Sequence, residues 1–423
     1  MGITKFTNCR VLQGDDLVNT DLWVSSDTGK VVDSQSVFYD EQLVPDDTLD
    51  LGGRIVAPGL IDCQLNGAFG FNFSTTLEAD PLYKDKTIYV NKELIKTGVT
   101  SYLPTVTSQK PELYHKTLPF LGPSGARRDY RDGAESLGAH VEGPFLSPTK
   151  NGIHDASVFR HAGTFDDVRA CYGAANFDQH NIRMITVAPE VCQMPKLLPE
   201  LTQRGVVCSI GHSEATYEEA VQAVQLGATM ITHLFNAMRP LHHRNPGIFG
   251  VLGNVESSRT PRPYFGVIAD GIHLHPTTIK IAFDAHPDGL ILVTDAMHMV
   301  GLADGRYEWT NGGATGVIVK VGSKLLLDGS DKIAGSCISL IECVNNFLAW
   351  TGATIPQALK VVTATPAAML GLAGVKGSFV TGADADLVIL SEQHVNGATQ
   401  LVVDEVWKFG APAFRREQTT TQP

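Results

Sequence analysis

The sequence predicts an α/β protein: a (β/α)8 TIM barrel with a small β-sandwich domain built from both ends of the chain. Eight apolar, strand-like runs alternate with helix-length segments in the middle of the chain, as in a parallel sheet with crossover helices. Short strand-like segments broken by turns fill the first 56 residues, and the same texture returns near the C-terminus. The expected domains are residues 1–56 and 376–423 for the discontinuous sandwich, the latter with a polar tail, and residues 57–375 for the barrel.

The barrel strands are expected wherever an apolar run ends at turn residues or at a polar side chain. Helical patterns separate several of these runs, and Ser213 is the expected N-cap of one such helix, residues 213–227. Two further helices, residues 338–350 and 355–372, are expected after the last strand. The eight runs are residues 54–67, 98–106, 137–144, 182–190, 205–213, 228–236, 264–273 and 290–296.

Composition excludes several function classes. The 423 residues carry 33 Lys and Arg against 45 Asp and Glu, a net charge of −12 with no long run of one sign, which argues against nucleic-acid or anionic-membrane partners. An anionic substrate would therefore need local cations. The N-terminus lacks a signal-peptide pattern, and no stretch approaches the roughly 18 apolar residues of a membrane helix. Seven cysteines without a CxxC pair are typical of reduced cytoplasmic thiols.

Four of the expected strands end on an acidic residue or a histidine: Glu142, His212, His233 and Asp295. The carboxyl ends of all barrel strands lie on one face, so these side chains are expected to converge around one ion. A catalytic zinc-type site needs about three protein ligands and an open position for water. Glu142, His212 and His233 supply three ligands, and Asp295 could accept a proton from the activated water.

Each of these residues also has a purely structural interpretation. Glu142 could cap a helix, and His212 or His233 could be a hydrogen-bonded core histidine. Asp295 could cap the segment that follows it, although that segment is a poor helix start. The structural interpretation is favoured for any one histidine alone, but three candidate ligands at strand ends favour a metal site.

The motifs HVEGPFL, GHSEAT, THLFNAM, ADGIH and LVTDA resemble those of the N-acetylglucosamine-6-phosphate deacetylases of the amidohydrolase superfamily. The resemblance covers nearly the whole chain in the expected order. Many amidohydrolases carry His-x-His after the first strand, and here that position reads Gln64-Leu65-Asn66. The resemblance therefore implies one divalent ion per subunit, held by Glu142, His212 and His233. A carboxylate and two imidazoles suit zinc, which is expected first, and also iron(II), cobalt(II) or manganese(II).

The resemblance also implies substrate contacts and a second catalytic residue. His154 would help to polarise the amide carbonyl, alongside Asp295 as base and acid. In this family the equivalent of Arg244 reaches the neighbouring subunit's site, which implies a homodimer. An Arg in an exposed turn suits phosphate oxygens, although a solvated basic loop is the alternative. The implied substrate-binding residues are Ile153, Asn236, Ala237, Arg244, Asp270, Gly271, Ile272, His273, Ile333, Ala334 and Gly335.

The activity implied is metal-dependent hydrolysis of the acetamide of N-acetyl-D-glucosamine 6-phosphate to D-glucosamine 6-phosphate and acetate, a step of amino-sugar metabolism in the cytoplasm. One alternative is another single-metal amidohydrolase, acting on a cyclic amide or an acylated amino acid. The other is a catalytically inactive barrel kept as a scaffold. Arg244 and the ADGIH motif argue against the first, and the intact set of Glu142, His212, His233 and Asp295 argues against the second.

Overall fold

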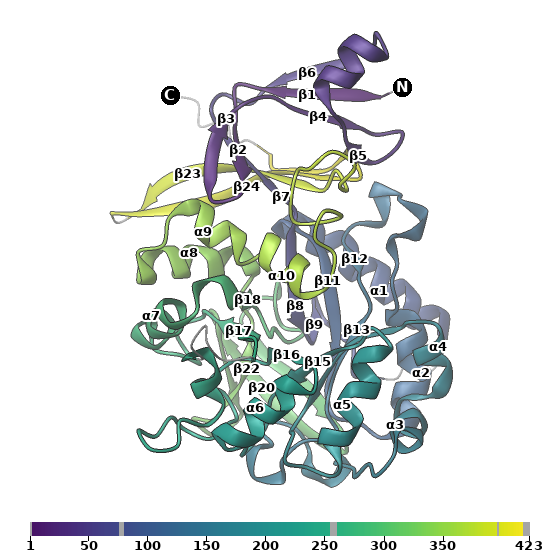
Figure 1. Ribbon diagram of the computed structural model, residues 1–423, viewed down its shortest axis with the longest axis vertical. Helices are drawn as coiled ribbons and strands as arrows, with labels where there is room; N and C mark the ends of the chain where they lie inside the picture. The colour runs from purple at the N-terminus through teal and green to yellow at the C-terminus, as the bar shows by residue number, and fades with distance from the viewer. Residues whose placement is uncertain (1, 76–79, 254–259, 396, 418–423) are drawn as a thin grey trace.

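The computed structural model describes residues 2–75, 80–253, 260–395 and 397–417. In Figure 1 a parallel barrel lies below a layer of sheets made by both ends of the chain. The expected (β/α)8 barrel is confirmed, with its strands in the expected order. These are β8 (Leu60–Leu65), β11 (Val99–Val106), β13 (Ala139–Glu142), β14 (Ile182–Val187), β15 (Val207–Ile210), β16 (Ala228–Ile231), β17 (Tyr264–Ile268) and β18 (Leu290–Val293).

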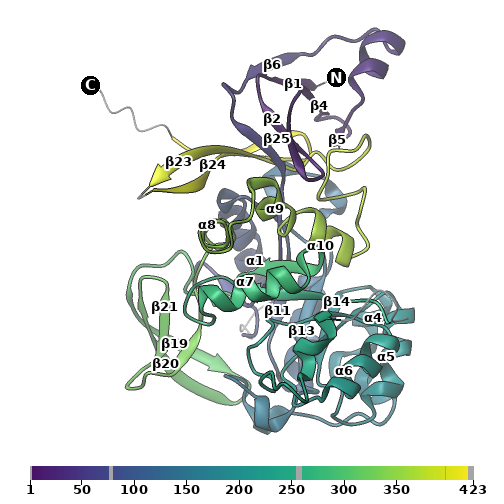
Figure 2. The same cartoon turned by 60° about the vertical axis from the view of Figure 1, so that its left-hand side comes forward.

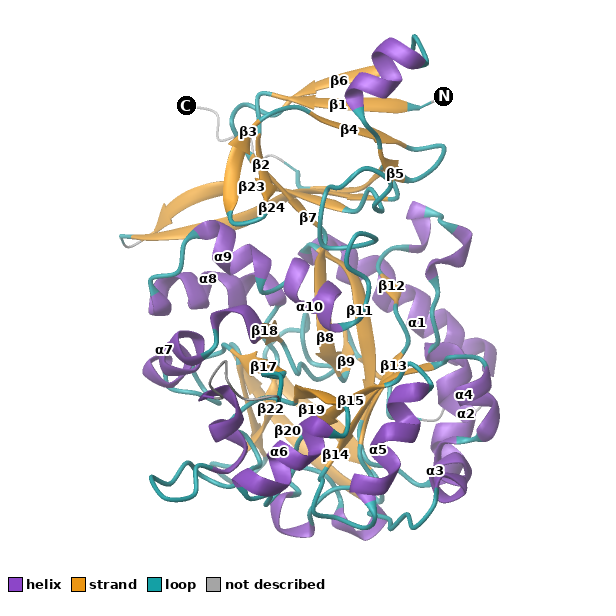
Figure 3. Ribbon diagram, viewed as in Figure 1, coloured by secondary structure: helices purple, strands orange, loops and turns teal. Residues whose placement is uncertain are grey.

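Helices surround the barrel strands (Figure 3). The prediction that Ser213 caps α6 (Tyr217–Gln225) is wrong. The N-cap is Thr216, whose hydroxyl accepts a hydrogen bond from the Glu219 amide in a capping box. The Ser213 hydroxyl instead donates to Glu190 Oε2 at 2.6 Å. The α-helices are α1 (Asp80–Leu94), α2 (Pro111–Leu121), α3 (Phe165–Tyr172), α4 (Ala174–Asp178), α5 (Met194–Gln203), α6 (Tyr217–Gln225), α7 (Pro276–Ala285), α8 (Leu340–Thr351), α9 (Ile355–Lys360) and α10 (Ala364–Met369).

The two chain ends share one sandwich above the barrel. One sheet has the order β5-β4-β1-β6, and the other, β25-β24-β23-β7-β2-β3, interleaves N-terminal and C-terminal strands. Side chains from both ends, including Phe6, Val11 and Trp407, form a common core. These strands are β1 (Ile3–Thr7), β2 (Arg10–Gln13), β3 (Asp16–Asn19), β4 (Leu22–Ser25), β5 (Lys30–Val31), β6 (Asp47–Asp50), β7 (Ile55–Pro58), β23 (Leu387–Val395), β24 (Ala398–Lys408) and β25 (Ala411–Arg415).

The chain passes from the sandwich to the barrel at Gly59. The apolar run that begins at Arg54 is thus two strands: β7 pairs with β2 and β23, and β8 pairs with β11. A Cβ atom on Gly59 would lie 2.1 Å from Thr100 Oγ1, so no larger residue fits at this crossing. Hydrophobicity alone did not reveal the division, because both strands are completely buried.

A four-stranded antiparallel sheet follows β18, and the sequence analysis assigned no strands to this segment. It consists of β19 (Gly305–Asn311), β20 (Ala314–Val321), β21 (Lys324–Leu327) and β22 (Ile333–Ser336). Figure 2 shows β19–β21 standing beside the barrel. The expected substrate residues Ile333, Ala334 and Gly335 lie on β22, so this sheet forms one wall of the candidate site.

The barrel closes between β8 and β18 through a few specific contacts. Within the described chain these two strands form no regular ladder, and an isolated bridge joins Leu65, at the end of β8, to Ala296, three residues beyond β18. The buried Asp62 carboxylate accepts hydrogen bonds from the Thr294 hydroxyl at 2.6 Å, the Thr294 amide at 3.3 Å and the Gln64 amide at 3.2 Å. The Asp62 side chain therefore connects β8 to Thr294, the residue immediately before Asp295.

We expect Asp62→Ala to lower the free energy of unfolding by about 1–3 kcal/mol, because it leaves the buried Thr294 hydroxyl and amide without their acceptor. Burial raises the pKa of Asp62 to about 7, so the neutral amide of Asp62→Asn is a mild replacement that keeps one acceptor oxygen. Urea unfolding of the two variants checks this. Equal stability of Asp62→Ala and the native chain would show that Asp62 does not hold the seam.

Candidate active site

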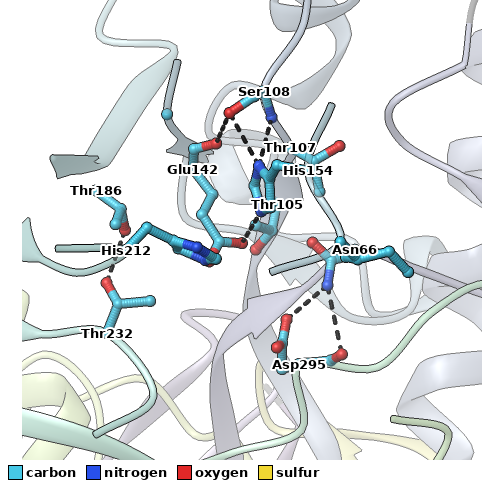
Figure 4. Close-up of polar contacts among 12 residues, drawn as sticks. Asn66, Thr105, Thr107, Ser108, Glu142, His154, Thr186, His212, Thr232 and Asp295 are labelled. Atoms are coloured by element: carbon cyan, nitrogen blue, oxygen red, sulfur yellow. Dashed lines mark hydrogen bonds and ion pairs between the residues drawn. The ribbon is translucent and has the colours of Figure 1, made fainter. Parts of the chain in front are cut away.

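Four predicted residues meet at the carboxyl end of the barrel, and Figure 4 labels three of them, Glu142, His212 and Asp295. Glu142 is the last residue of β13, whereas His212, His233 and Asp295 each stand two residues beyond the end of a strand. Glu142 Oε1 lies 3.0 Å from Nε2 of both His212 and His233, and these two nitrogens are 3.1 Å apart. Glu142, His212 and His233 are buried, and Asp295 is partly exposed to the same cavity.

Three of these residues have left-handed backbone conformations. The φ angles of His212, His233 and Asp295 are 49°, 26° and 47°. Non-glycine residues seldom adopt positive φ, and such strain gathers at functional sites. The sharp turn at each strand end belongs to the site, and none of the three positions with positive φ carries the glycine that would have indicated such a turn in the sequence.

The hydrogen bonds of His212 fix its tautomer. Its Nδ1 lies 2.8 Å from the Lys150 carbonyl oxygen, which can only accept, so Nδ1 carries the hydrogen and Nε2 presents a lone pair. That lone pair faces Glu142 Oε1, itself an acceptor. Gln64 Nε2 also donates to Glu142 Oε1 at 3.1 Å, which orients the carboxylate. Converging buried lone pairs of this kind suit a divalent cation.

His154 also faces Glu142, so a second three-residue set, Glu142, His154 and His212, is close enough to hold an ion. The Ser108 amide donates to His154 Nδ1 at 3.2 Å, which makes Nδ1 an acceptor and leaves the hydrogen on Nε2. Burial lowers the pKa of His154 to about 3, so the ring is neutral. The Nε2 atom of His154 lies 3.9 Å from Glu142 Oε2 and carries a hydrogen, so it can act as a hydrogen-bond donor. A metal ligand needs a lone pair, so His233 fits the third ligand position better than His154 does.

Asp295 is oriented by a residue that the sequence analysis gave no role. Asn66 Nδ2 donates to Asp295 Oδ1 at 2.6 Å, and the Asp295 amide donates to the Gln64 carbonyl at 2.8 Å. Desolvation by the surrounding protein and the negative charge of Glu142 raise the pKa of Asp295 to about 6. A carboxyl group with a pKa near neutrality can both accept and return a proton.

In the segment after β17, Asp270 orients His273, and His273 lines the cavity. Asp270 accepts from His273 Nδ1 at 2.6 Å and from the backbone amides of Ile272 and His273, each at 2.9 Å. His273 lines the cavity, whereas Asp270, Gly271 and Ile272 do not. The Asp270 carboxylate thus holds the His273 ring so that Nε2 is free for a ligand.

A cavity of about 230 Å³ opens over the four strand-end residues. It includes the expected Ile153, His154, Asn236, Ala237, His273, Ile333, Ala334 and Gly335, but not Arg244, which is exposed outside it. Sequence reasoning missed much of the wall contributed by the antiparallel sheet and by the loops after β8 and β11. The missed lining residues include Asn66, Asn72, Thr107, Trp309, Asn311 and Lys332.

A second buried acidic group, Glu135, Asp384 and Asp386, lies between the barrel and the sandwich. Lys408 donates to Glu135 Oε1 at 2.6 Å and to Asp386 Oδ2 at 2.7 Å, and Lys376 pairs with all three carboxylates. Two ammonium groups already supply the positive charge there. This cluster joins the two parts of the chain and is not a metal site.

Known proteins share this sequence and architecture. The amidohydrolase family model matches residues 55–412. N-acetylglucosamine-6-phosphate deacetylases from Mus musculus and Homo sapiens are 42% and 41% identical, over 96% and 97% of both chains. The chain belongs to the N-acetylglucosamine-6-phosphate deacetylase family.

Solved structures of the deacetylase family have the same fold. The Pasteurella multocida deacetylase superposes with a TM-score of 0.79 at 26% identity, over 97% of this chain and 99% of that one. A variant of the Mycobacterium smegmatis deacetylase, solved in complex with N-acetyl-D-glucosamine-6-phosphate, also gives 0.79, at 27% identity over 98% and 100%. The resemblance inferred from the motifs is therefore confirmed.

At the end of β8 this chain has Gln64 and, one residue beyond the strand, Asn66, where many amidohydrolases carry two histidines. Both amides are already engaged, with Glu142 and Asp295 respectively. This favours one ion per site.

Among the described helices, none is both long and apolar enough to cross a membrane.

Proposed function

We propose that this chain hydrolyses the acetamide of N-acetyl-D-glucosamine 6-phosphate, releasing D-glucosamine 6-phosphate and acetate with one divalent ion per subunit. The observation that carries the proposal is the convergence of Glu142 Oε1 with Nε2 of His212 and His233, within 3.1 Å, in a cavity that Asp295 also lines. The full-length similarity to named deacetylases supports the substrate. An inactive scaffold would have no need to retain this set of residues.

Glu142, His212 and His233 would hold the ion, with Gln64 fixing the carboxylate and Lys150 the tautomer of His212. Zinc is the first choice for a carboxylate and two imidazoles, and iron(II), cobalt(II) and manganese(II) suit the same donors. When bound, such an ion lowers the pKa of water and polarises a carbonyl group.

The chain's own residues would move the protons. The Nε2–H of His154 donates to the amide carbonyl oxygen as negative charge develops on it. Asp295 accepts the proton of the attacking water and delivers it to the nitrogen as the C–O bond forms and the C–N bond breaks. The hydrogen bond from Asn66 orients the carboxylate for both transfers. His273 and Asn236 line the same cavity and would bind the sugar.

We further propose a cytoplasmic homodimer in which Arg244 binds the 6-phosphate in the partner's site. Arg244 is exposed and lies outside the cavity of its own chain, in a turn with His242 and His243. A guanidinium fork matches phosphate oxygens in a bidentate pair. The seven cysteines form no disulfide, which supports a reducing compartment.

Arg244→Ala should raise KM for the phosphorylated sugar by about 10-fold to 100-fold, the loss expected for charge-assisted hydrogen bonds, and barely change turnover of N-acetylglucosamine. Steady-state kinetics on both sugars checks this. Mixing Arg244→Ala with Asp295→Asn chains should restore activity in heterodimers if the contact crosses the interface. No restoration would place the contact within one chain, and equal losses on both sugars would make Arg244 structural.

The proposed function is tested by hydrolysis assays of the metal-loaded protein, in which acetate release is measured for the acetylated substrates and ring opening for the cyclic amide. We expect turnover of N-acetyl-D-glucosamine 6-phosphate to exceed that of N-acetylglucosamine, of an N-acetyl amino acid and of a cyclic amide. Preference for either of the last two would support the other single-metal amidohydrolase. Hydrolysis of none of these four substrates would support the scaffold.

A further inference from the structure

We infer that Lys332 binds the 6-phosphate from within the same chain and so helps to set the preference for the phosphorylated sugar. This inference rests on the proposed function. Lys332 is the one lysine or arginine among the described residues that line the cavity. Because the chain is strongly acidic and the cavity contains Glu142 and Asp295, an anionic substrate needs a cation at this place.

The backbone of Lys332 is held firmly at the turn between β21 and β22. Its carbonyl accepts from the Leu327 amide at 3.0 Å, and its own amide donates to Ser330 Oγ at 3.2 Å. The side chain extends across the cavity wall, where Nζ donates to the Gly152 carbonyl at 3.3 Å. The sheet therefore delivers this ammonium group to the loop that leads to His154.

The contact with Gly152 places the ammonium group near cavity residues that the deacetylase motif assigns to the substrate. A Cβ atom on Gly152 would lie 3.2 Å from His212 Cε1 and 3.9 Å from the Ala237 side chain. Ala237 and its neighbour Asn236 both line the cavity. Through Gly152, Lys332 thus lies near the residues that the deacetylase motif assigns to the substrate.

The charge of Lys332 is available to a ligand. Within the described chain it forms no ion pair, and its one hydrogen bond leaves two of its three donors unused. A compact ammonium group of this kind binds phosphate as a point charge.

Lys332 is not needed to hold the loop at residues 152–155, because other hydrogen bonds already connect this loop to the antiparallel sheet. Asp155 Oδ2 accepts from the Gly313 amide at 2.8 Å, and Asn311 Nδ2 donates to the Ile153 carbonyl at 3.4 Å. Removing the Lys332 hydrogen bond would leave these two contacts intact. The loop can therefore keep its place without Lys332.

The test compares Lys332→Met and Lys332→Arg with Lys324→Met, a control on the same sheet that is exposed and does not line the cavity. We expect Lys332→Met to lower kcat/KM for the phosphorylated sugar by about 10-fold to 100-fold, mainly through KM, as expected for a charged hydrogen bond. Turnover of N-acetylglucosamine should change less than about twofold. Lys332→Arg should recover most of the loss, and Lys324→Met should behave like the native chain.

Binding of D-glucosamine 6-phosphate, measured by calorimetry, keeps this test independent of turnover. A weaker Kd in Lys332→Met that Lys332→Arg restores would support the inference even if the native chain released no acetate. Equal losses on phosphorylated and unphosphorylated sugars, no loss, or no rescue by arginine would overturn it. Acetate release by the native chain decides the proposed function separately.

Discussion

Asp295→Asn should lower kcat by at least about 10³-fold while leaving the ion and the bound sugar in place. General acid and base catalysis each contribute about 10² to 10⁴, and this residue is proposed to serve in both steps. An asparagine can still present Oδ1 to Asn66 Nδ2, so the local packing and the hydrogen bond should survive. What it lacks is the capacity to take the proton from water and return it to nitrogen.

The unfolding free energy, the ion content and the turnover of Asp295→Asn, measured together, distinguish the possible roles of Asp295. If Asp295 were a helix cap, the unfolding free energy would fall by about 1 kcal/mol with little kinetic change. If it were a tight ligand, the ion content would fall as well. Near-normal turnover, with ion content and stability unchanged, would remove Asp295 from the mechanism.

His212→Ala and His233→Ala should each lose both the ion and nearly all activity, because a three-ligand site cannot spare an imidazole. His154→Ala should keep the ion and lose rate, since the lost group is a hydrogen-bond donor to the carbonyl, typically worth about 10² to 10³ in kcat. Metal analysis of the purified variants, followed by kinetics, checks this.

The same variants distinguish the two candidate ligand sets around Glu142. If Glu142, His154 and His212 held the ion, His154→Ala would empty the site and His233→Ala would not. That outcome would also contradict the tautomer that the Ser108 amide imposes on His154. His140→Ala is the matched control, because His140 is a buried histidine two residues from Glu142 whose ring contacts Thr186 at 2.7 Å.

The sequence was sufficient to predict where the main site residues gather. Glu142, His212, His233 and Asp295 all follow strands, and a parallel barrel places the ends of its strands on one face. Their left-handed φ angles could not be predicted, because the surrounding structure imposes them against the local preference of His and Asp. The roles of Asn66 and Ser108 were likewise hidden, since each depends on contact with a residue distant in sequence.

The antiparallel sheet after β18 escaped prediction for a related reason. Its strands are partly exposed, and nothing in residues 305–336 indicates that they pack beside the barrel and form a wall of the cavity. Lys332 therefore looked like one more surface cation in the sequence. Its contact with Gly152 exists only once the sheet and the barrel loop are brought together.

The central claim is that one divalent ion, held by Glu142, His212 and His233, supports deacetylation. The most direct test adds zinc stepwise to the metal-stripped protein and measures acetate release from N-acetyl-D-glucosamine 6-phosphate at each step. The rate should rise in proportion to added zinc and level off at about one ion per chain, as a single three-ligand site requires. A rate that levels off at two ions per chain, or that does not depend on the ion, would contradict the account.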